Sequence, residues 1–315
     1  KMGVEINITD DEVIVEGVGL HGLEAPSEAL YTGNSGTTTR LLCGILAGQP
    51  FTVTMSGDPS IQKRPMGRVM KPLREMGASI EGKNDNFCPL TLFPSELHGI
   101  EYRLPVASAQ LKSAILLAGL YAEGQPTVIE PAPSRDHTER MFRALGVEIE
   151  TNGSTITLDP PEDLHAVDIA VPGDISSAAF FLVAAAIVPR SELTIKNVGV
   201  NPTRTGVLDV LRDMGADITE SNFRDEAEPM CDLTVKYSKL HGVEIGGAII
   251  PRLIDELPVI AVAAAFAEGE TVIRDAQELK VKESNRIAAM VTELTKAGVD
   301  VEETDDGMIV HGGAK

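Results

Sequence analysis

Asp255 and the segment Lys282-Glu283-Ser284-Asn285-Arg286 form the strongest set of residues capable of catalysis in this 315-residue chain. Asp255 comes just ahead of an apolar stretch that we expect to be a helix, where a carboxylate would be partly desolvated. Lys282 and Arg286 are four residues apart, so they share one face if the segment is helical, with Glu283 beside them. Two cations and two carboxylates suit an anionic substrate that needs general acid–base catalysis. The alternative is a surface ion network, which usually contributes little to stability.

Three other polar segments stand directly before predicted helices and are candidates for binding an anion. In Asn34-Ser35-Gly36-Thr37, the free backbone amides of a helix start could bind a phosphate or carboxylate, or the segment could be an ordinary N-cap. The guanidinium of Arg64 precedes the next helix, where its charge opposes the helix dipole; a bound anion would remove that conflict. Ser108 and Gln110 stand at the mouth of an apolar helix and could bind hydroxyl or phosphate groups, with ordinary capping as the alternative.

The segment Ser134-Arg135-Asp136-His137-Thr138-Glu139 could equally be a capping box, with Thr138 or Asp136 as the cap and Glu139 reaching back. His137 is interpreted as a structural hydrogen-bonding residue rather than a metal ligand. None of these segments has metal-ligand spacing, and the sequence contains no Walker A, G-x-S-x-G or G-x-G-x-x-G motif. Each segment is a weak signal by itself.

An internal repeat is expected to bring these segments together. A short phrase of the type Met-Gly-Ala-Asp-Ile recurs about every 70–80 residues, which indicates one supersecondary unit used repeatedly. Its glycines are Gly3, Gly77, Gly146, Gly215 and Gly298. Each follows a helical stretch and precedes an alternating strand, where a helix cap needs a residue that tolerates positive φ. The order of patterns between the glycines is βαβαββ, so we predict an α/β fold with mixed sheets, and the polar segments fall in corresponding loops.

The Pro-Gly turn at Val171-Pro172-Gly173-Asp174 is the clearest internal boundary. We therefore expect a first lobe at 1–172 and a second lobe at 173–315. The apolar stretches 114–122, 178–188 and 259–267 are shorter than the roughly 20 residues of a membrane span and are interpreted as core helices, apolar on every side.

The formal net charge of −20 argues against nucleic-acid binding, which favours a basic surface, and disfavours an anionic membrane surface. A site for an anionic ligand therefore has to be local, with Arg and Lys gathered against the overall charge. The three cysteines, Cys43, Cys88 and Cys231, are far apart and form no C-x-x-C pair. A disulfide framework or zinc site is not expected, and a cytoplasmic location fits.

Across essentially all 315 residues the chain resembles the family of 5-enolpyruvylshikimate-3-phosphate synthases (3-phosphoshikimate 1-carboxyvinyltransferases). The resemblance rests on Asn34-Ser35-Gly36-Thr37, Lys63-Arg64-Pro65, Ser108-Ala109-Gln110, Asp255 and Lys282-Glu283 through Arg286. Three signatures of the class II branch are Ser108-Ala109-Gln110-Leu111-Lys112, Arg135-Asp136-His137-Thr138-Glu139 and Asn201-Pro202-Thr203-Arg204. It implies two lobes, each of three βαβαββ units with buried apolar helices, closing on phosphoenolpyruvate and shikimate 3-phosphate.

The resemblance also implies roles for individual residues. Shikimate 3-phosphate is expected to contact Ser108, Ala109, Gln110, Ser134, Arg135, Asp255 and Lys282, and phosphoenolpyruvate to contact Gly36, Arg64, Gln110 and Arg286. Asp255 would take the proton from the attacking 5-hydroxyl, Glu283 would protonate and deprotonate the methylene carbon, and Lys282 would support the oxygens. The reaction is an addition–elimination through a tetrahedral ketal, without metal or organic cofactor. Glyphosate occupies the phosphoenolpyruvate site and meets family members at Gly36, so a glycine there predicts sensitivity.

The chain also departs from the family pattern. The N-terminal Gly-Asp-Lys-Ser segment and the C-terminal Asp-His-Arg segment are absent, and five repeat glycines stand where the family has six. We expect an incomplete first unit and a missing last unit, and a monomeric chain that does not turn over alone. The alternative is a non-catalytic fragment that keeps the fold and part of the substrate binding. The related UDP-N-acetylglucosamine enolpyruvyltransferases use a loop cysteine, whereas Cys43 falls in an apolar helix and Cys88 beside Pro89, so that family is disfavoured.

Overall fold

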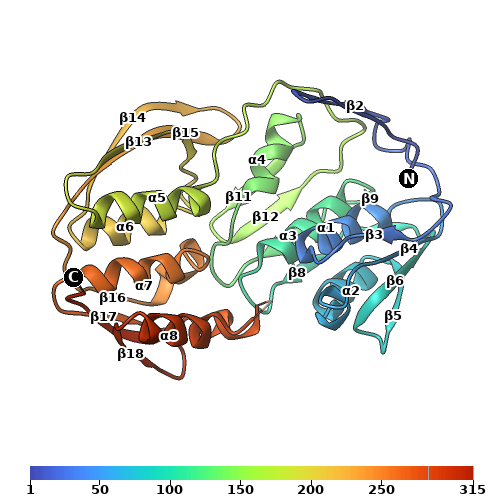
Figure 1. The fold of residues 1–315 in the computed structure, drawn as a ribbon. Helices are drawn as coiled ribbons and strands as arrows, with labels where there is room; N and C mark the ends of the chain where they lie inside the picture. The colour runs from blue at the N-terminus through green and yellow to red at the C-terminus, as the bar shows by residue number, and fades with distance from the viewer. Residues whose placement is uncertain (283, 315) are drawn as a thin grey trace. The chain divides into compact units, whose positions relative to one another are not determined.

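The computed structural model describes residues 1–282 and 284–314, and Figure 1 traces their helices and strands. The chain divides into two compact units, Lys1–Val167 and Asp168–Lys315. Each unit has its own core of buried aliphatic side chains. The small share of aromatic residues in the sequence is therefore compensated by Leu, Ile, Val, Met and Ala packed between helices and sheets.

One topology recurs in three four-stranded sheets, in the orders β3-β4-β6-β5, β8-β10-β12-β11 and β16-β17-β19-β18. In each sheet the first two strands are parallel and are joined through a helix. The last two strands form an antiparallel pair that adds to the second strand. A further helix joins the second and third strands, so the predicted order βαβαββ is confirmed.

The first unit opens with an exposed antiparallel hairpin and contains two of these sheets. The hairpin is β1 (Glu5–Ile8) with β2 (Val13–Glu16). The first repeat comprises β3 (Leu30–Tyr31), α1 (Gly36–Ala47), β4 (Val53–Ser56), η1 (Ile61–Lys63), α2 (Gly67–Glu75), β5 (Ser79–Lys83) and β6 (Phe87–Phe93). The next comprises β7 (Leu97–His98), β8 (Glu101–Arg103), α3 (Ala109–Gly119), β9 (Ala122–Glu123), β10 (Thr127–Ile129), α4 (His137–Ala144), β11 (Ile149–Asn152) and β12 (Thr155–Leu158).

The second unit contains the third sheet and a three-stranded sheet in the order β13-β15-β14. Its first repeat comprises α5 (Ile175–Ile187), β13 (Glu192–Gly199), α6 (Gly206–Asp213), β14 (Asp217–Asp225) and β15 (Pro229–Lys236). Here a parallel bridge between Gly173 and Val198 stands where the other repeats have their first strand. The next comprises β16 (Glu244–Ile245), η2 (Gly247–Arg252), α7 (Leu257–Phe266), β17 (Glu270–Ile273), η3 (Gln277–Val281), α8 (Arg286–Lys296), β18 (Asp300–Glu303) and β19 (Met308–His311).

The repeat glycines have the backbone conformation expected from the sequence. Gly3, Gly77, Gly146, Gly215 and Gly298 all have positive φ, between +82° and +102°. The last four follow the ends of α2, α4, α6 and α8, where the chain must reverse into a strand. A side chain in this region of φ is strained, which explains why glycine recurs there.

The apolar helices differ in how completely they are buried. Most side chains of α3 and α7 lie in the core, and α1 packs directly against α3. Helix α5 is also apolar, but Phe180 and Phe181 are each 60% exposed, so the prediction of burial on every side does not hold for this face of α5. Among residues 1–282 and 284–314, no helix combines the length and apolar character needed to cross a membrane.

Candidate active site

The guanidinium groups of two arginines lie beside the first residue of helix α1. Ser35 is its N-cap and accepts a hydrogen bond from the Thr38 amide at 3.1 Å, so the capping interpretation of this segment is correct. Gly36 is the first residue of the helix and is buried. A Cβ atom on Gly36 would lie 2.9 Å from Nη1 of Arg40 and 2.9 Å from Nη1 of Arg64. Two guanidinium groups therefore meet over a glycine, which leaves space that any other residue would fill.

Gln110 ties this pair of cations to helix α3. Arg40 Nη1 donates to Gln110 Oε1 at 2.7 Å, and Gln110 Nε2 donates to Thr37 Oγ1 at 2.8 Å. The starts of α1 and α3 are thereby joined, and the amide of Gln110 has one defined orientation. The structure thus brings together the predicted Gly36, Arg64 and Gln110, and adds Arg40, to which the sequence analysis gave no role. A signal was available, because Arg40 stands four residues after Gly36 on the same face of the helix.

Arg40 and Arg64 place two positive charges next to each other at the start of α1. Burial, and then the charges of Arg64 and Arg68, lower the pKa of Arg40 to about 10, so it remains protonated at neutral pH. Within residues 1–282 and 284–314, no carboxylate lies at ion-pair distance from either Arg40 or Arg64. Two neighbouring cations without a counter-ion make this a favourable place for a bound anion.

Ser108 caps helix α3, as its alternative interpretation predicted. Its side chain accepts from the amide of Leu111 at 3.4 Å. Ala109 and Gln110 form the first turn of the same helix, and all three residues are partly exposed. The proposed contacts of Ser108 and Ala109 with a ligand therefore stay predictions.

The predicted capping box in residues 134–139 is not formed. Asp136 is the N-cap of α4 without a side-chain capping bond, and its Oδ2 instead accepts from Arg140 Nε at 3.0 Å. Glu139 does not reach back to the helix start, because its carboxylate binds Lys112 Nζ at 2.6 Å. The sequence pattern is typical of a capping box, but the ammonium group of Lys112 binds the Glu139 carboxylate instead.

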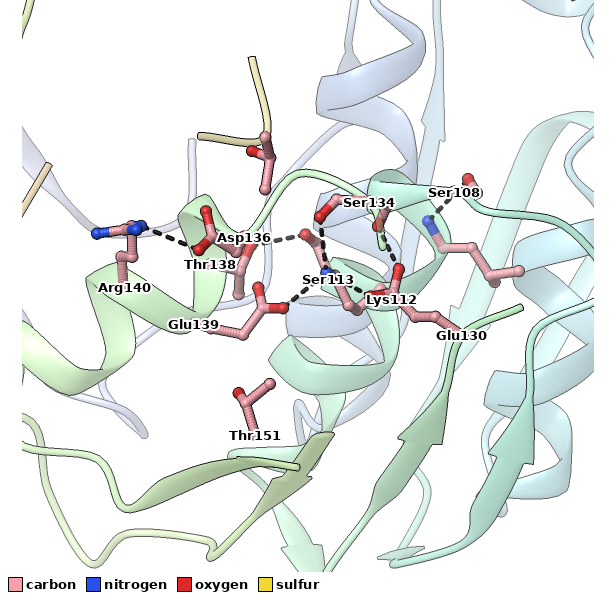
Figure 2. Close-up of polar contacts among 12 residues, drawn as sticks. Ser108, Lys112, Ser113, Glu130, Ser134, Asp136, Thr138, Glu139, Arg140 and Thr151 are labelled. Carbon is pink, nitrogen blue, oxygen red and sulfur yellow. Dashed lines mark hydrogen bonds and ion pairs between the residues drawn. The ribbon is translucent and has the colours of Figure 1, made fainter. Parts of the chain in front are cut away.

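Lys112 is the centre of a buried ionic cluster, drawn in Figure 2, which we call the Lys112 cluster: Lys112, Glu130, Ser134 and Glu139. Lys112 is 1% exposed, and its ammonium lies 3.1 Å from Glu130 Oε2 and 2.6 Å from Glu139 Oε1. It also donates to the Ser134 carbonyl at 3.5 Å, and the Ser134 hydroxyl donates to Glu130. Lys112 appeared in a family signature, but its partners were not foreseen.

In the second unit, Asp255 and Arg286 are brought together. Arg286 Nη1 donates to Asp255 Oδ1 at 3.1 Å, and their side chains are only 25% and 29% exposed, respectively. Asp255 precedes α7, and Arg286 is the first residue of α8. The predicted partial burial of Asp255 is thus present.

Lys282 and Arg286 would share one face only if the segment were helical, and that condition is not met. Asn285 caps α8 by accepting from the Ala288 amide at 3.1 Å, so the helix begins at Arg286. Lys282 lies in extended backbone after η3 and pairs with Glu278 at 3.3 Å. Glu283, the predicted acid–base residue, lies outside the described residues.

A second polar network, with the buried Glu256 as one member, lies beside Asp255 at the start of α7. Glu256 is 2% exposed and accepts a hydrogen bond from the hydroxyl of Ser176. Arg204 donates to Ser176 Oγ at 2.6 Å and pairs with Asp174 at 3.0 Å. The network connects α5, α7 and the loop that carries the Asn201-Pro202-Thr203-Arg204 signature. It holds the backbone next to Asp255 in place.

No group of three or more His, Cys, Asp or Glu residues suited to a metal ion occurs in the described part of the chain. The three cysteines are buried.

Comparison with known proteins gives a consistent result. All of residues 1–315 match the family model described as EPSP synthase (3-phosphoshikimate 1-carboxyvinyltransferase). The 3-phosphoshikimate 1-carboxyvinyltransferase of Geobacillus thermodenitrificans is 59% identical over 314 residues, which cover 99% of this chain and 73% of that protein. The protein of the same name from Geobacillus kaustophilus is 60% identical, with 99% and 74% covered. The structure of EPSP synthase from Acinetobacter baumannii superposes with a TM-score of 0.90 at 50% identity, covering 100% of this chain and 72% of that one.

Proposed function

The chain belongs to the EPSP synthase (3-phosphoshikimate 1-carboxyvinyltransferase) family, and from this premise we propose how its own residues divide the reaction. The enzyme is a transferase of the shikimate pathway. It moves the enolpyruvyl group of phosphoenolpyruvate to the 5-hydroxyl of shikimate 3-phosphate and releases phosphate. The names of the relatives do not favour the alternative of a non-catalytic fragment.

Phosphoenolpyruvate is the anion that Arg40 and Arg64 receive over Gly36 in this proposal. The observation that carries it is the meeting of two guanidinium groups over a glycine, with no carboxylate partner in the described residues. Guanidinium groups bind phosphate and carboxylate with paired hydrogen bonds. Gln110 holds Arg40 in place and contributes its own amide. Arg286 is the further cation that we assign to this substrate.

Shikimate 3-phosphate is assigned to the starts of α3 and α4. Ser108, Ala109 and Gln110 form the first of these helix starts, and Ser134 and Arg135 lie in the loop before the second. Free amides at helix starts attract a phosphate, and the guanidinium of Arg135 supplies a full positive charge. Both substrates then meet positive groups in a chain whose overall charge is −20.

Asp255 is the proposed general base for the 5-hydroxyl. Arg286 Nη1 donates a hydrogen bond to its Oδ1 at 3.1 Å, which orients the carboxylate. As the hydroxyl oxygen attacks C2 of phosphoenolpyruvate, its proton passes to Asp255 and C3 gains a proton from an acid. Loss of a proton from C3 with departure of phosphate restores the double bond. Glu283 for the carbon protons and Lys282 for the substrate oxygens stay assignments by family resemblance.

The test measures phosphate release by the Asp255→Asn variant of the enzyme in the presence of both substrates. We expect kcat to fall by about 10²–10⁴-fold, as for loss of a general base, because Asn keeps the size but cannot accept the proton. Asp213→Asn, an exposed acid at the end of α6, is the matched control and should be unaffected. A variant at position 255 that keeps more than a tenth of the rate would exclude Asp255 as the base.

A further inference from the structure

The Lys112 cluster uses charge where stability alone does not require it. A lysine that is 1% exposed is rare, and the carboxylates of Glu130 and Glu139 around it are nearly as buried. Removing several charges from water is costly, and apolar residues of similar volume are often as stable or more stable in such positions. A role in placing other groups explains the cluster better than a role in stability.

The cluster connects helix α3 with the stretch 130–139, which runs from the end of β10 into α4. Lys112 lies in α3, Glu130 follows β10, Ser134 lies in the loop before α4, and Glu139 lies in the first turn of α4. The ammonium binds both carboxylates, and it donates to the Ser134 carbonyl at 3.5 Å. Figure 2 shows these contacts converging on Lys112 from the surrounding segments. The loop between β10 and α4 is therefore fixed at both ends by one ammonium group.

Glu130 transmits this constraint to the side chain of Ser134. Its Oε2 binds Lys112, and its Oε1 accepts the hydroxyl hydrogen of Ser134. A serine hydroxyl has a single hydrogen to donate, so in this arrangement Ser134 has none left for a phosphate. Ser134 thus serves as an attachment point of the loop, while the adjacent Arg135 supplies the charge for the ligand.

The charge of the cluster is also balanced by Lys112. Burial raises the pKa of Glu139, against the opposing effect of Lys112, and Glu139 Oε2 has no hydrogen-bond partner within the described residues. A protonated Glu139 would leave Lys112 and Glu130 as a neutral pair. Without Lys112, acidic groups beside the loop would instead repel a phosphate.

We propose that Lys112 is a positioning residue for shikimate 3-phosphate: with Glu130 and Glu139 it fixes the loop that presents Arg135 to the phosphate. The inference rests on the proposed assignment of Arg135 to that substrate. Lys112 itself is buried and does not touch the ligand, so its removal should weaken the binding of one substrate selectively.

The test measures KM for each substrate in the enzyme and in its variants. Equilibrium binding of shikimate 3-phosphate to the same proteins is measured by calorimetry. Lys112→Met leaves two buried acids without their cation and is at risk of not folding. The triple variant Lys112→Met, Glu130→Gln, Glu139→Gln therefore carries the test, because its side chains are similar in size and uncharged. We expect its Kd and KM for shikimate 3-phosphate to rise at least tenfold, while KM for phosphoenolpyruvate and the unfolding temperature change little.

Two further variants separate the possible outcomes. Arg143→Met is the matched control, since Arg143 lies at the far end of α4 and contacts Thr151 rather than the loop. Arg135→Met tests the assignment on which the inference rests and should weaken shikimate 3-phosphate binding.

If Arg135→Met weakens binding while the triple variant binds within twofold of the parent, the positioning role is excluded. If Arg135→Met has no effect, the assignment of the phosphate site fails first. Equal increases in both KM values would indicate a merely structural cluster and overturn the inference.

Discussion

Gly36→Ala is the smallest change that should separate binding from stability in this enzyme. Gly36 is the first residue of α1, and its φ lies outside the left-handed region, so alanine can adopt the same backbone. Alanine favours helix over glycine by up to about 1 kcal/mol in a helix interior, so the fold should not be weakened. The new methyl group, however, would lie 2.9 Å from Nη1 of both Arg40 and Arg64.

The displacement of these two groups sets the size of the effect. To reach an ordinary contact, each guanidinium must move from 2.9 Å to 3.4 Å or beyond from the new Cβ. At an effective dielectric constant of about 20, moving one charge from about 4 to about 4.5 Å from an anion weakens the attraction by about 0.5 kcal/mol. Two guanidiniums give about 1 kcal/mol, which corresponds to about a fivefold rise in KM for phosphoenolpyruvate. Any direct contact of the methyl group with the substrate would add to this.

The assay measures phosphate release against each substrate in turn, with thermal unfolding of the same variant. KM for phosphoenolpyruvate should rise, KM for shikimate 3-phosphate should stay within twofold, and the unfolding temperature should not fall. Because glyphosate meets family members at this glycine, its inhibition constant should rise at least as much. Gly17→Ala is the control, since a Cβ at Gly17 meets nothing within 4 Å. Unchanged KM for phosphoenolpyruvate together with a lower unfolding temperature would refute the assignment of this space to the substrate.

Two further predictions follow from buried or capping groups. Burial raises the pKa of Cys43 to about 12 and that of Cys231 to about 11, and it also raises the pKa of Cys88. None of the three thiols should therefore react with a thiol reagent at pH 8 until urea unfolds the chain. Rapid labelling of the folded protein would contradict this prediction. Asp174→Ala should destabilise α5 by about 1 kcal/mol at pH 7 in urea unfolding, through loss of the N-cap bond from the Ser177 amide, whereas Asp174→Asn should keep most of it. Burial alone would raise the pKa of Asp174, but the hydrogen bonds from Ser177, the charge of Arg204 and a hydrogen bond from Ser176 together outweigh it and lower the pKa. The ionised cap is therefore fully present above about pH 4 and is lost as the pH falls through the lowered value; a destabilisation independent of pH would argue against it.

The repeated architecture could be predicted from sequence because its signals are local. A glycine with positive φ after an amphipathic helix depends on a few neighbouring residues, and each repeat carries the same signal. The strand order then follows from the recurrence of βαβαββ. Which face of an apolar helix stays exposed, as at Phe180 and Phe181 of α5, depends instead on tertiary neighbours.

The candidate site was predictable where a residue type and its position in a loop are sufficient. Arg64 and Gln110 belong to the set predicted around Gly36, whereas Arg40 was assigned no role because its contacts cross from α1 to α3. Lys282 lies outside α8 for a local reason, because Asn285 is a strong N-cap and the helix begins at the residue after it.

Basic residues of one chain serve two different purposes, and their partners distinguish them. Lys112 is nearly fully buried between two carboxylates, so its charge is already neutralised and is available only for positioning. Arg40 is also buried, yet its guanidinium binds an amide and a carbonyl rather than a carboxylate, and Arg64 repels it. Burying a cation next to another cation is unfavourable unless an anion joins them in some state of the protein. In a chain with 47 acidic residues, ion-pair partners for these arginines were readily available in the sequence. That none lies beside them in the described structure is the strongest reason to assign their charge to phosphoenolpyruvate.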